Sequence, residues 1–169
     1  MDVDADLRII NDARVVPGAY LLSDFRVKDA DLAGQVKRTL AAATLNEEQE
    51  RAFRIVANHS VSVTPSPLLI YIAGMGGTGK TRVIDTVRRW FDARSEANRM
   101  IVLAPTGAAA SVVRGSTYHS YLGVATGDRR NYAQRGGKAL EEARLRMRGV
   151  DYIFMDEISM VSCQDLYLI

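Results

Sequence analysis

Apolar residues recur every three or four positions over several stretches of the chain, which is the spacing of amphipathic helices. This spacing predicts helices over Asp29–Ala43, from Asn46 to about Ser60, over Thr81–Ala97, near Ala108–Arg114, around Lys138–Arg148 and from about Ser162 onward. Asn46 is a suitable N-cap for the second helix, with Gln49 three positions later. The third helix has the most distinct apolar face, made of Val83, Ile84, Val87, Trp90 and Phe91.

Short, almost wholly apolar runs lie between these helices, at Leu68–Ala73, Met100–Ala104 and Tyr152–Met155. Their length is that of buried strands rather than of helices. Because such strands alternate with helices, we expect an α/β fold with a parallel sheet covered by helices on both faces. Residues 1–44 are weakly patterned and form a partly helical N-terminal extension, so the predicted domain covers residues 45–169.

Composition narrows the class of protein only in part. The chain has 169 residues, of which 47% are hydrophobic and 25% charged, which suits one globular domain with a real core. A net charge of +2 means that any nucleic-acid surface has to be a local patch. The single cysteine, Cys163, excludes an internal disulfide and a cysteine-built zinc site. No apolar run approaches the roughly 20 residues of a membrane span, so we expect a soluble intracellular protein.

The strongest chemical signal is the segment Gly74-Met75-Gly76-Gly77-Thr78-Gly79-Lys80-Thr81, which fits the phosphate-binding pattern G-x-x-x-x-G-K-[ST] at every fixed position. Glycines allow successive backbone N–H groups to surround phosphate oxygens, and the following helix adds its N-terminal dipole. Lys80 would neutralise the β and γ phosphates, and the Thr81 hydroxyl would bind Mg²⁺. A dinucleotide-binding loop is disfavoured because the next strand ends at Leu103–Thr106 without a carboxylate.

Asp156 and Glu157 follow the last apolar strand, where an open parallel sheet would bring them to the crevice that holds the phosphate loop. Asp156 would hold Mg²⁺ through its water shell, and Glu157 would orient and deprotonate the attacking water. Two adjacent carboxylates are, by themselves, more often a solvated loop. Downstream of a complete phosphate loop, they indicate hydrolysis of a nucleoside triphosphate.

Four blocks, in this order, resemble the petite-integration-frequency (Pif-type) family of superfamily-one DNA helicases. They are Leu45–Gln49, Gly74–Thr81, Ala104–Ala110 continued by Gly115–Ser120, and Asp156–Met160. The continuation Ser162–Tyr167 is most similar to the Helitron-like branch. The resemblance covers the chain from Leu45 onward and implies a RecA-like P-loop NTPase domain that uses ATP and Mg²⁺.

The resemblance also implies binding residues outside the phosphate loop. It places Gln49 at the adenine edge, and it places Thr106, Gly107, Thr117 and His119 along a channel for single-stranded DNA. The alternative is that Thr106 only caps a helix and that His119 packs in a loop. Tyr118 and Tyr121 are candidates for base stacking, although one of them is expected in the core. The basic segment 128–148 either contacts the DNA backbone or is a solvated helix face.

By the same resemblance, the activity is ATP-dependent 5′-to-3′ DNA unwinding in the nucleus, in repair, recombination or telomere maintenance. The resemblance places arginine fingers in a second RecA-like domain. We expect the present chain to be an incomplete first motor domain that is inactive without that domain or another chain. The alternative function is a fragment that binds nucleotide or single-stranded DNA without turnover. A small-molecule kinase is disfavoured because Glu157 is placed to activate water.

Overall fold

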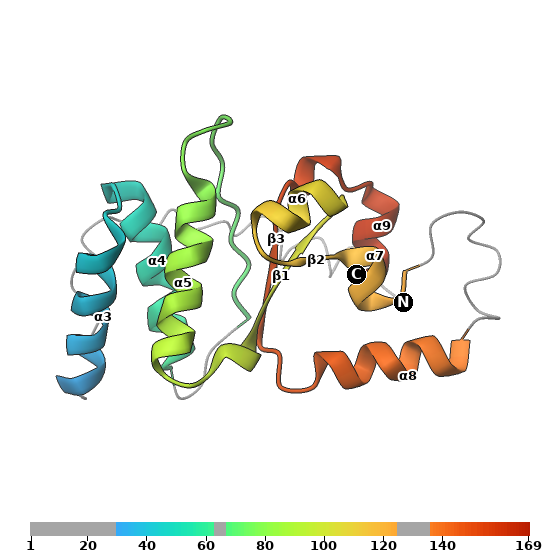
Figure 1. Ribbon diagram of the computed structural model, residues 1–169, viewed down its shortest axis with the longest axis horizontal. Coiled ribbons are helices and arrows are strands. Elements are labelled where there is room, and N and C mark those ends of the chain that lie inside the picture. The colour runs from blue at the N-terminus through green and yellow to red at the C-terminus, as the bar shows by residue number, and fades with distance from the viewer. Residues whose placement is uncertain (1–29, 63–66, 125–135) are drawn as a thin grey trace, which may run out of the picture.

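The computed structural model describes residues 30–62, 67–124 and 136–169, and its elements are labelled in Figure 1. In chain order they are α3 (Ala30–Ala43), α4 (Glu47–Ser60), α5 (Lys80–Ala93), η1 (Ala97–Arg99), β1 (Met100–Ala104), α6 (Gly107–Val112), β2 (Ser116–Thr117), α7 (Tyr118–Leu122), α8 (Gly136–Met147), β3 (Tyr152–Met155), η3 (Ile158–Met160) and α9 (Cys163–Leu168). Most of the predicted N-terminal extension, residues 1–29, lies outside the described residues.

The described strands form a parallel sheet in the order β2-β1-β3. Ala104 at the end of β1 is paired with Thr117 of β2, and Leu103 is paired with Met155 at the end of β3. The carboxyl ends of all the described strands therefore lie at the same edge of the sheet. This arrangement confirms the predicted parallel α/β architecture within the described residues and sets where the loops that follow each strand emerge.

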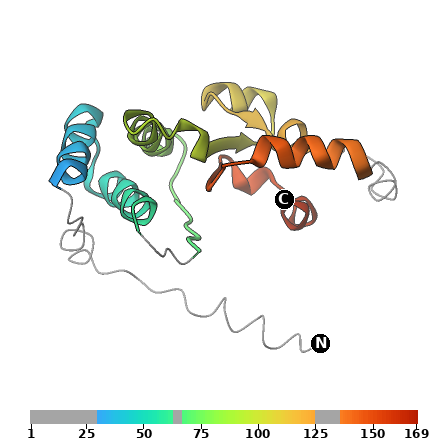
Figure 2. The same ribbon diagram turned by 90° about the horizontal axis from the view of Figure 1, so that it is seen from below.

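The central strand β1 contributes alternate side chains to two apolar clusters, one on each face of the sheet. Val102 packs with the buried faces of α4 and α5, where Phe53 and Trp90 meet edge to face with ring centroids 6.3 Å apart. Leu103, on the other face, packs with Tyr118 of α7. Figures 1 and 2 show α3, α4 and α5 grouped together, with α7, α8 and α9 at the opposite end of the molecule. Helices thus cover both faces, as the apolar strands predicted.

Most of the predicted elements are confirmed, with small differences at their ends. β1 and β3 have the predicted limits, and α3 is helical from the first described residue, Ala30, to the predicted end at Ala43. The helix after the phosphate loop ends at Ala93 rather than Ala97, because its C-terminal turn is closed by Arg94 and Ser95, whose N–H groups donate to carbonyls of the last turn. Its predicted inward face is buried throughout, from Val83 to Phe91.

The prediction of a strand at Leu68–Ala73 is wrong, because this run does not join the sheet that the described residues form. Its side chains alternate poorly between inside and outside, and Leu69 and Tyr71 are 96% and 75% exposed. Apolar composition alone does not make a strand, since a strand exists only when a neighbour completes its hydrogen-bond ladder. Among the described residues no strand lies in register with this run.

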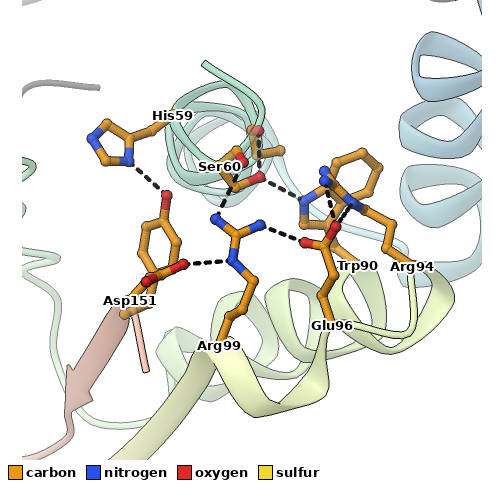
Figure 3. Close-up of polar contacts among 9 residues, drawn as sticks. His59, Ser60, Trp90, Arg94, Glu96, Arg99 and Asp151 are labelled. Carbon is orange, nitrogen blue, oxygen red and sulfur yellow. Dashed lines mark hydrogen bonds and ion pairs between the residues drawn. The ribbon is translucent and has the colours of Figure 1, made fainter. Parts of the chain in front are cut away.

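A polar cluster joins the C-terminal ends of α4 and α5 to the start of β3 (Figure 3). Arg99 lies at its centre and donates to Asp151 Oδ2 at 2.6 Å, to Glu96 Oε2 at 2.5 Å and to the Ser60 carbonyl at 3.4 Å. Partial burial lowers the pKa of Arg99, but the hydrogen bonds to Asp151 and Glu96 outweigh it and raise the pKa above its ordinary value. The guanidinium therefore stays charged and crosslinks three segments.

Trp90 and Tyr152 connect this cluster to the apolar core. The fully buried Trp90 ring donates its Nε1–H to Ser60 Oγ at 3.0 Å, and Ser60 donates in turn to the Ala57 carbonyl at 2.7 Å. The Tyr152 hydroxyl lies 2.7 Å from His59 Nδ1. These bonds satisfy the polar atoms of large aromatic side chains that fill the core, so His59 and Trp90 have structural contacts here.

Candidate nucleotide-binding and DNA-binding sites

The phosphate loop, Gly74–Thr81, leads directly into α5 and is shaped by its glycines. Gly77 and Gly79 have φ values of 80° and 83°, a left-handed conformation that glycine adopts without the strain of a Cβ. Thr78 closes the loop, because its hydroxyl donates to the Met75 carbonyl at 2.8 Å. An added Cβ at Gly76 would meet nothing within 4 Å, so the space beside this residue is open.

The start of α5 offers uncapped N–H groups. Its N-cap residue is Gly79, which has no side chain to accept from the first turn, and the first turn contains no acidic residue. Four N–H groups at a helix start lack partners within the helix, and together with the helix dipole they attract an anion. The Arg82 N–H donates to the Gly79 carbonyl at 2.9 Å, but no side chain caps the first turn, so this helix N-terminus is favourable for phosphate.

Lys80 lies across this loop. Its Nζ donates to the carbonyls of Gly74 at 2.8 Å and Met75 at 3.0 Å, and the residue is half-buried. The ammonium group is thus held by backbone oxygens of the first two residues of the loop. A phosphate that entered the loop would gain this positive charge as a partner once the ammonium group released the two carbonyls.

One pocket brings the phosphate loop and the acidic pair together. It has a volume of about 380 Å³, and its lining includes Gly74, Lys80, Asp156 and Glu157. Asp156 directly follows β3, and its backbone N–H donates to the Leu103 carbonyl of β1 at 2.8 Å, which extends the ladder by one residue. Glu157 has a φ of 49°, a left-handed turn that ends the strand and directs the chain into η3. The rest of the lining comes mainly from the runs 68–72 and 151–155.

The segments with the predicted DNA-binding residues begin at the same edge of the sheet. Thr106 is the N-cap of α6, and its Oγ1 accepts from the Ala109 N–H at 3.2 Å. Thr117 ends β2 and is the N-cap of α7, where its Oγ1 accepts from the Ser120 N–H at 3.3 Å. Thr106 and Gly107 are exposed, and Thr117 and His119 are half-buried. The capping role that was the alternative for Thr106 is therefore present, and an exposed cap remains accessible to a ligand.

The two candidate stacking residues have different surroundings. Tyr118 is only 3% exposed and belongs to the core, with its hydroxyl 3.3 Å from Asp165 and its ring stacked on His119 at a centroid distance of 3.9 Å. Tyr121 is half-buried and holds α8, since its hydroxyl donates to the Arg146 carbonyl at 2.9 Å and Arg146 donates back to the Tyr121 carbonyl at 2.7 Å. In the basic segment, residues 128–135 lie outside the described residues.

Gln49 has contacts that the sequence did not suggest. As predicted, Asn46 and Gln49 form a reciprocal capping pair at the start of α4. In addition, the Gln49 amide donates to the Thr78 carbonyl in the phosphate loop at 3.0 Å. The contact joins residues 29 positions apart, so no local pattern could have indicated it. The adenine contact implied for Gln49 stays a prediction.

Membrane insertion has no support in the described part of the chain, where no helix is both long and apolar enough to cross a bilayer. The described residues also contain no group of three or more histidine, cysteine, aspartate or glutamate side chains that could hold a metal ion.

Comparisons with known proteins agree with this geometry. The sequence profile of the PIF1-like helicase family matches residues 44–167. The chain is 33% identical over 142 residues to the ATP-dependent DNA helicase PIF1 of Trypanosoma brucei brucei, a match that covers 80% of this chain and 13% of that protein. It is 35% identical over 103 residues to the ATP-dependent DNA helicase Pif1 of Bdellovibrio bacteriovorus, covering 59% and 22% of the respective chains.

A third relative is the ATP-dependent DNA helicase RRM3 of Saccharomyces cerevisiae, 26% identical over 118 residues, or 69% of this chain and 15% of that protein. The chain therefore spans less than a quarter of the length of each of these relatives. No solved structure matches it. The family profile covers both the phosphate loop and the acidic pair, and on this match the chain belongs to the PIF1-like helicase family.

Proposed function

We propose that this chain is the nucleotide-binding part of an ATP-dependent DNA helicase. The observation that carries the proposal is the shared pocket lined by Gly74, Lys80, Asp156 and Glu157. A phosphate-loop lysine and a strand-end carboxylate pair around one cavity form the arrangement that binds and hydrolyses a nucleoside triphosphate. Membership of the PIF1-like helicase family supports ATP as the nucleotide and DNA as the polymer.

The roles of the residues follow from their chemistry. The backbone N–H groups of the phosphate loop bind the phosphate oxygens. Lys80 compensates the charge of the β and γ phosphates. The loop consists of Gly74, Met75, Gly76, Gly77, Thr78, Gly79, Lys80 and Thr81. Lys80 must first exchange its carbonyl partners, Gly74 and Met75, for phosphate oxygens. Glu157 orients the attacking water and accepts its proton.

Thr81 and Asp156 fit a Mg²⁺ ion bound with ATP. A hydroxyl in the first turn of α5 and a carboxylate at the end of β3 are the hard oxygen donors that Mg²⁺ prefers. Asp156 would act through the water shell of the ion, and the phosphates would supply further ligands. The chemistry that Mg²⁺ supplies is neutralisation of charge on the β and γ phosphates.

Single-stranded DNA is the proposed polymer partner, held by Thr106, Gly107, Thr117 and His119. The support is their position after β1 and β2, at the edge where β3 ends in the acidic pair. The hydroxyls and the exposed N-terminus of α6 suit phosphate oxygens, which position a strand without reading its sequence. Movement is proposed to be 5′ to 3′, in nuclear repair, recombination or telomere maintenance, and the chain is proposed to belong to the Helitron-like branch.

Turnover by these 169 residues alone should be slow. The arginine fingers that the resemblance places in a second RecA-like domain are worth about 10³–10⁵ in rate. Binding of ATP, in contrast, depends on the phosphate loop itself. A function restricted to binding nucleotide or single-stranded DNA without turnover is the alternative for this polypeptide by itself.

The deciding experiment measures MgATP binding and hydrolysis by the wild type, Lys80→Ala and Lys37→Ala, with and without single-stranded DNA. Lys37 is an exposed lysine of α3 and serves as the matched charge control. We expect Lys80→Ala to abolish ATP binding and Lys37→Ala to leave it unchanged. Equal ATP affinity of wild type and Lys80→Ala would refute the proposed nucleotide site.

The hydrolysis data separate the remaining alternatives. A DNA-stimulated rate that Lys80→Ala abolishes supports a helicase active site completed by another chain. Lys80-dependent binding without any hydrolysis supports the binding-only alternative for the isolated 169 residues. Transfer of the γ-phosphate to an added nucleoside, rather than to water, would instead support a small-molecule kinase.

A further inference from the structure

Gln49 bridges the start of α4 and the phosphate loop, and both ends of its amide are occupied by backbone groups. Its Oε1 accepts from the Asn46 N–H at 3.0 Å. Its Nε2 donates to the Thr78 carbonyl at 3.0 Å and more weakly to the Gly79 carbonyl at 3.5 Å. The side chain thus joins a helix cap to the residues that immediately precede Lys80.

This contact is close as well as polar. A Cβ added at Gly79 would lie 2.6 Å from Gln49 Nε2, so the amide rests directly on the loop backbone. Gly79 has a φ of 83°, and it is the residue at which the loop turns into α5. The amide therefore contacts the phosphate loop at a residue whose conformation favours glycine.

Planarity of the peptide group gives the contact a consequence for phosphate binding. In a trans peptide the N–H points opposite to the carbonyl of the same unit. Holding the Thr78 carbonyl toward Gln49 therefore directs the Gly79 N–H away from Gln49. This N–H group belongs to the set that a phosphate loop uses to surround phosphate oxygens.

We infer that Gln49 is a positioning residue that sets the phosphate-loop backbone for the triphosphate, whatever base the nucleotide carries. The inference rests on the proposed function, because it assumes that the loop binds a nucleotide. It differs from the adenine contact that the resemblance implies, since it acts through the loop backbone and not through the base. The two roles predict different dependences on the base.

The test measures dissociation constants of MgATP, MgGTP and Mg²⁺-tripolyphosphate, which has no base, for the wild type, Gln49→Glu and Gln49→Ala. Gln49→Glu keeps the oxygen that accepts from the Asn46 N–H and so preserves the capping box, but it replaces the donor to the loop by an acceptor. Gln49→Ala removes both contacts without adding a charge. Thermal unfolding of each variant checks that α4 and the fold are retained.

We expect both variants to weaken all three ligands by the same factor, about two- to tenfold, which corresponds to the loss of one ordinary hydrogen bond. If the affinity for MgATP fell by more than this shared factor, Gln49 would contact the base in addition to positioning the loop. Weakening confined to MgATP, or no weakening at all, would overturn the inference. Failure of the proposed function looks different, because then even the wild type would bind none of the three ligands in a Lys80-dependent manner.

Discussion

Substitution of Gly115 tests how closely the chain packs against β1 just before β2, the strand that ends at the proposed DNA-binding residue Thr117. It lies between α6 and β2, where the chain returns to pair with β1, and its N–H donates to the Ala110 carbonyl at 2.8 Å. An added Cβ would lie 2.3 Å from the Val102 carbonyl oxygen and 2.9 Å from its carbon. Both atoms belong to the backbone of the central strand, so no side-chain rotation can relieve the clash.

The expected cost of Gly115→Ala follows from this geometry. Overpacking in a well-packed region costs about 1–3 kcal/mol, and a clash with strand backbone belongs in the upper half of that range. Part of the cost is offset, because alanine restricts the unfolded chain and contributes about 0.4–1 kcal/mol to stability. A net loss of about 2 kcal/mol lowers Tm by roughly 4–8 °C for a domain of this size.

Gly107→Ala is the matched control, because a Cβ there would meet nothing within 4 Å and Gly107 is not among the glycines with positive φ. It lies at the start of α6, where alanine is a better helix former than glycine, so its Tm should equal or slightly exceed that of the wild type. Thermal unfolding followed by circular dichroism measures both variants. If Gly115→Ala melted together with Gly107→Ala, the close approach of β2 to β1 would be refuted.

Two further predictions concern the polar cluster at the ends of α4 and α5. Arg99→Ala should lower the free energy of unfolding by about 1–3 kcal/mol, because it removes charged hydrogen bonds, including the one to Asp151. Arg54→Ala, which breaks only the i,i+4 pair with Glu50, should cost about 0.3–0.5 kcal/mol in the same denaturant titration. Equal losses in the two variants would contradict the prediction for Arg99. Burial raises the pKa of the Tyr152 phenol above its ordinary value. Its folded form therefore keeps its proton longer than the unfolded form, so its contribution to stability is complete below about pH 10 and is lost as pH rises through the folded pKa. Urea titrations between neutral and alkaline pH should show a steeper loss of stability in the wild type than in Tyr152→Phe, and parallel curves would contradict this origin.

The sequence predicted well those elements whose formation is decided locally. The apolar face of α5, including Trp90, is buried as its spacing indicated, and Asn46 and Gln49 cap α4 as their separation indicated. Helix periodicity and capping depend on residues within one or two turns, so they can be read from a single segment. The strand β2 was not predicted, because Ser116 and Thr117 are polar and their pairing depends on β1 rather than on their own composition.

The same distinction explains the misplaced strand. Leu68–Ala73 has the composition of a buried strand, but strand formation requires a partner, and sequence does not reveal which neighbour a run will have. In the structure the run and β3 line the same pocket, and the run reaches the phosphate loop without joining the ladder. The phosphate loop could still be located from sequence, because its glycines and lysine are a local pattern, whereas its contact with Gln49 is a tertiary one.

The central strand links the proposed nucleotide and DNA sites in a way that composition could not indicate. Leu103 of β1 accepts the Asp156 N–H at 2.8 Å, and it is also paired with Ser116, the residue before Thr117. The acidic pair on one side and the proposed DNA-binding threonine on the other are therefore positioned by the same residue of a buried strand. Sites built on strand ends are held more precisely than sites on loops, because ladder hydrogen bonds limit their movement. Any displacement of β1 would move both sites together, which is why Gly115, in contact with Val102 one residue earlier, is a position where a single methyl group should disturb both.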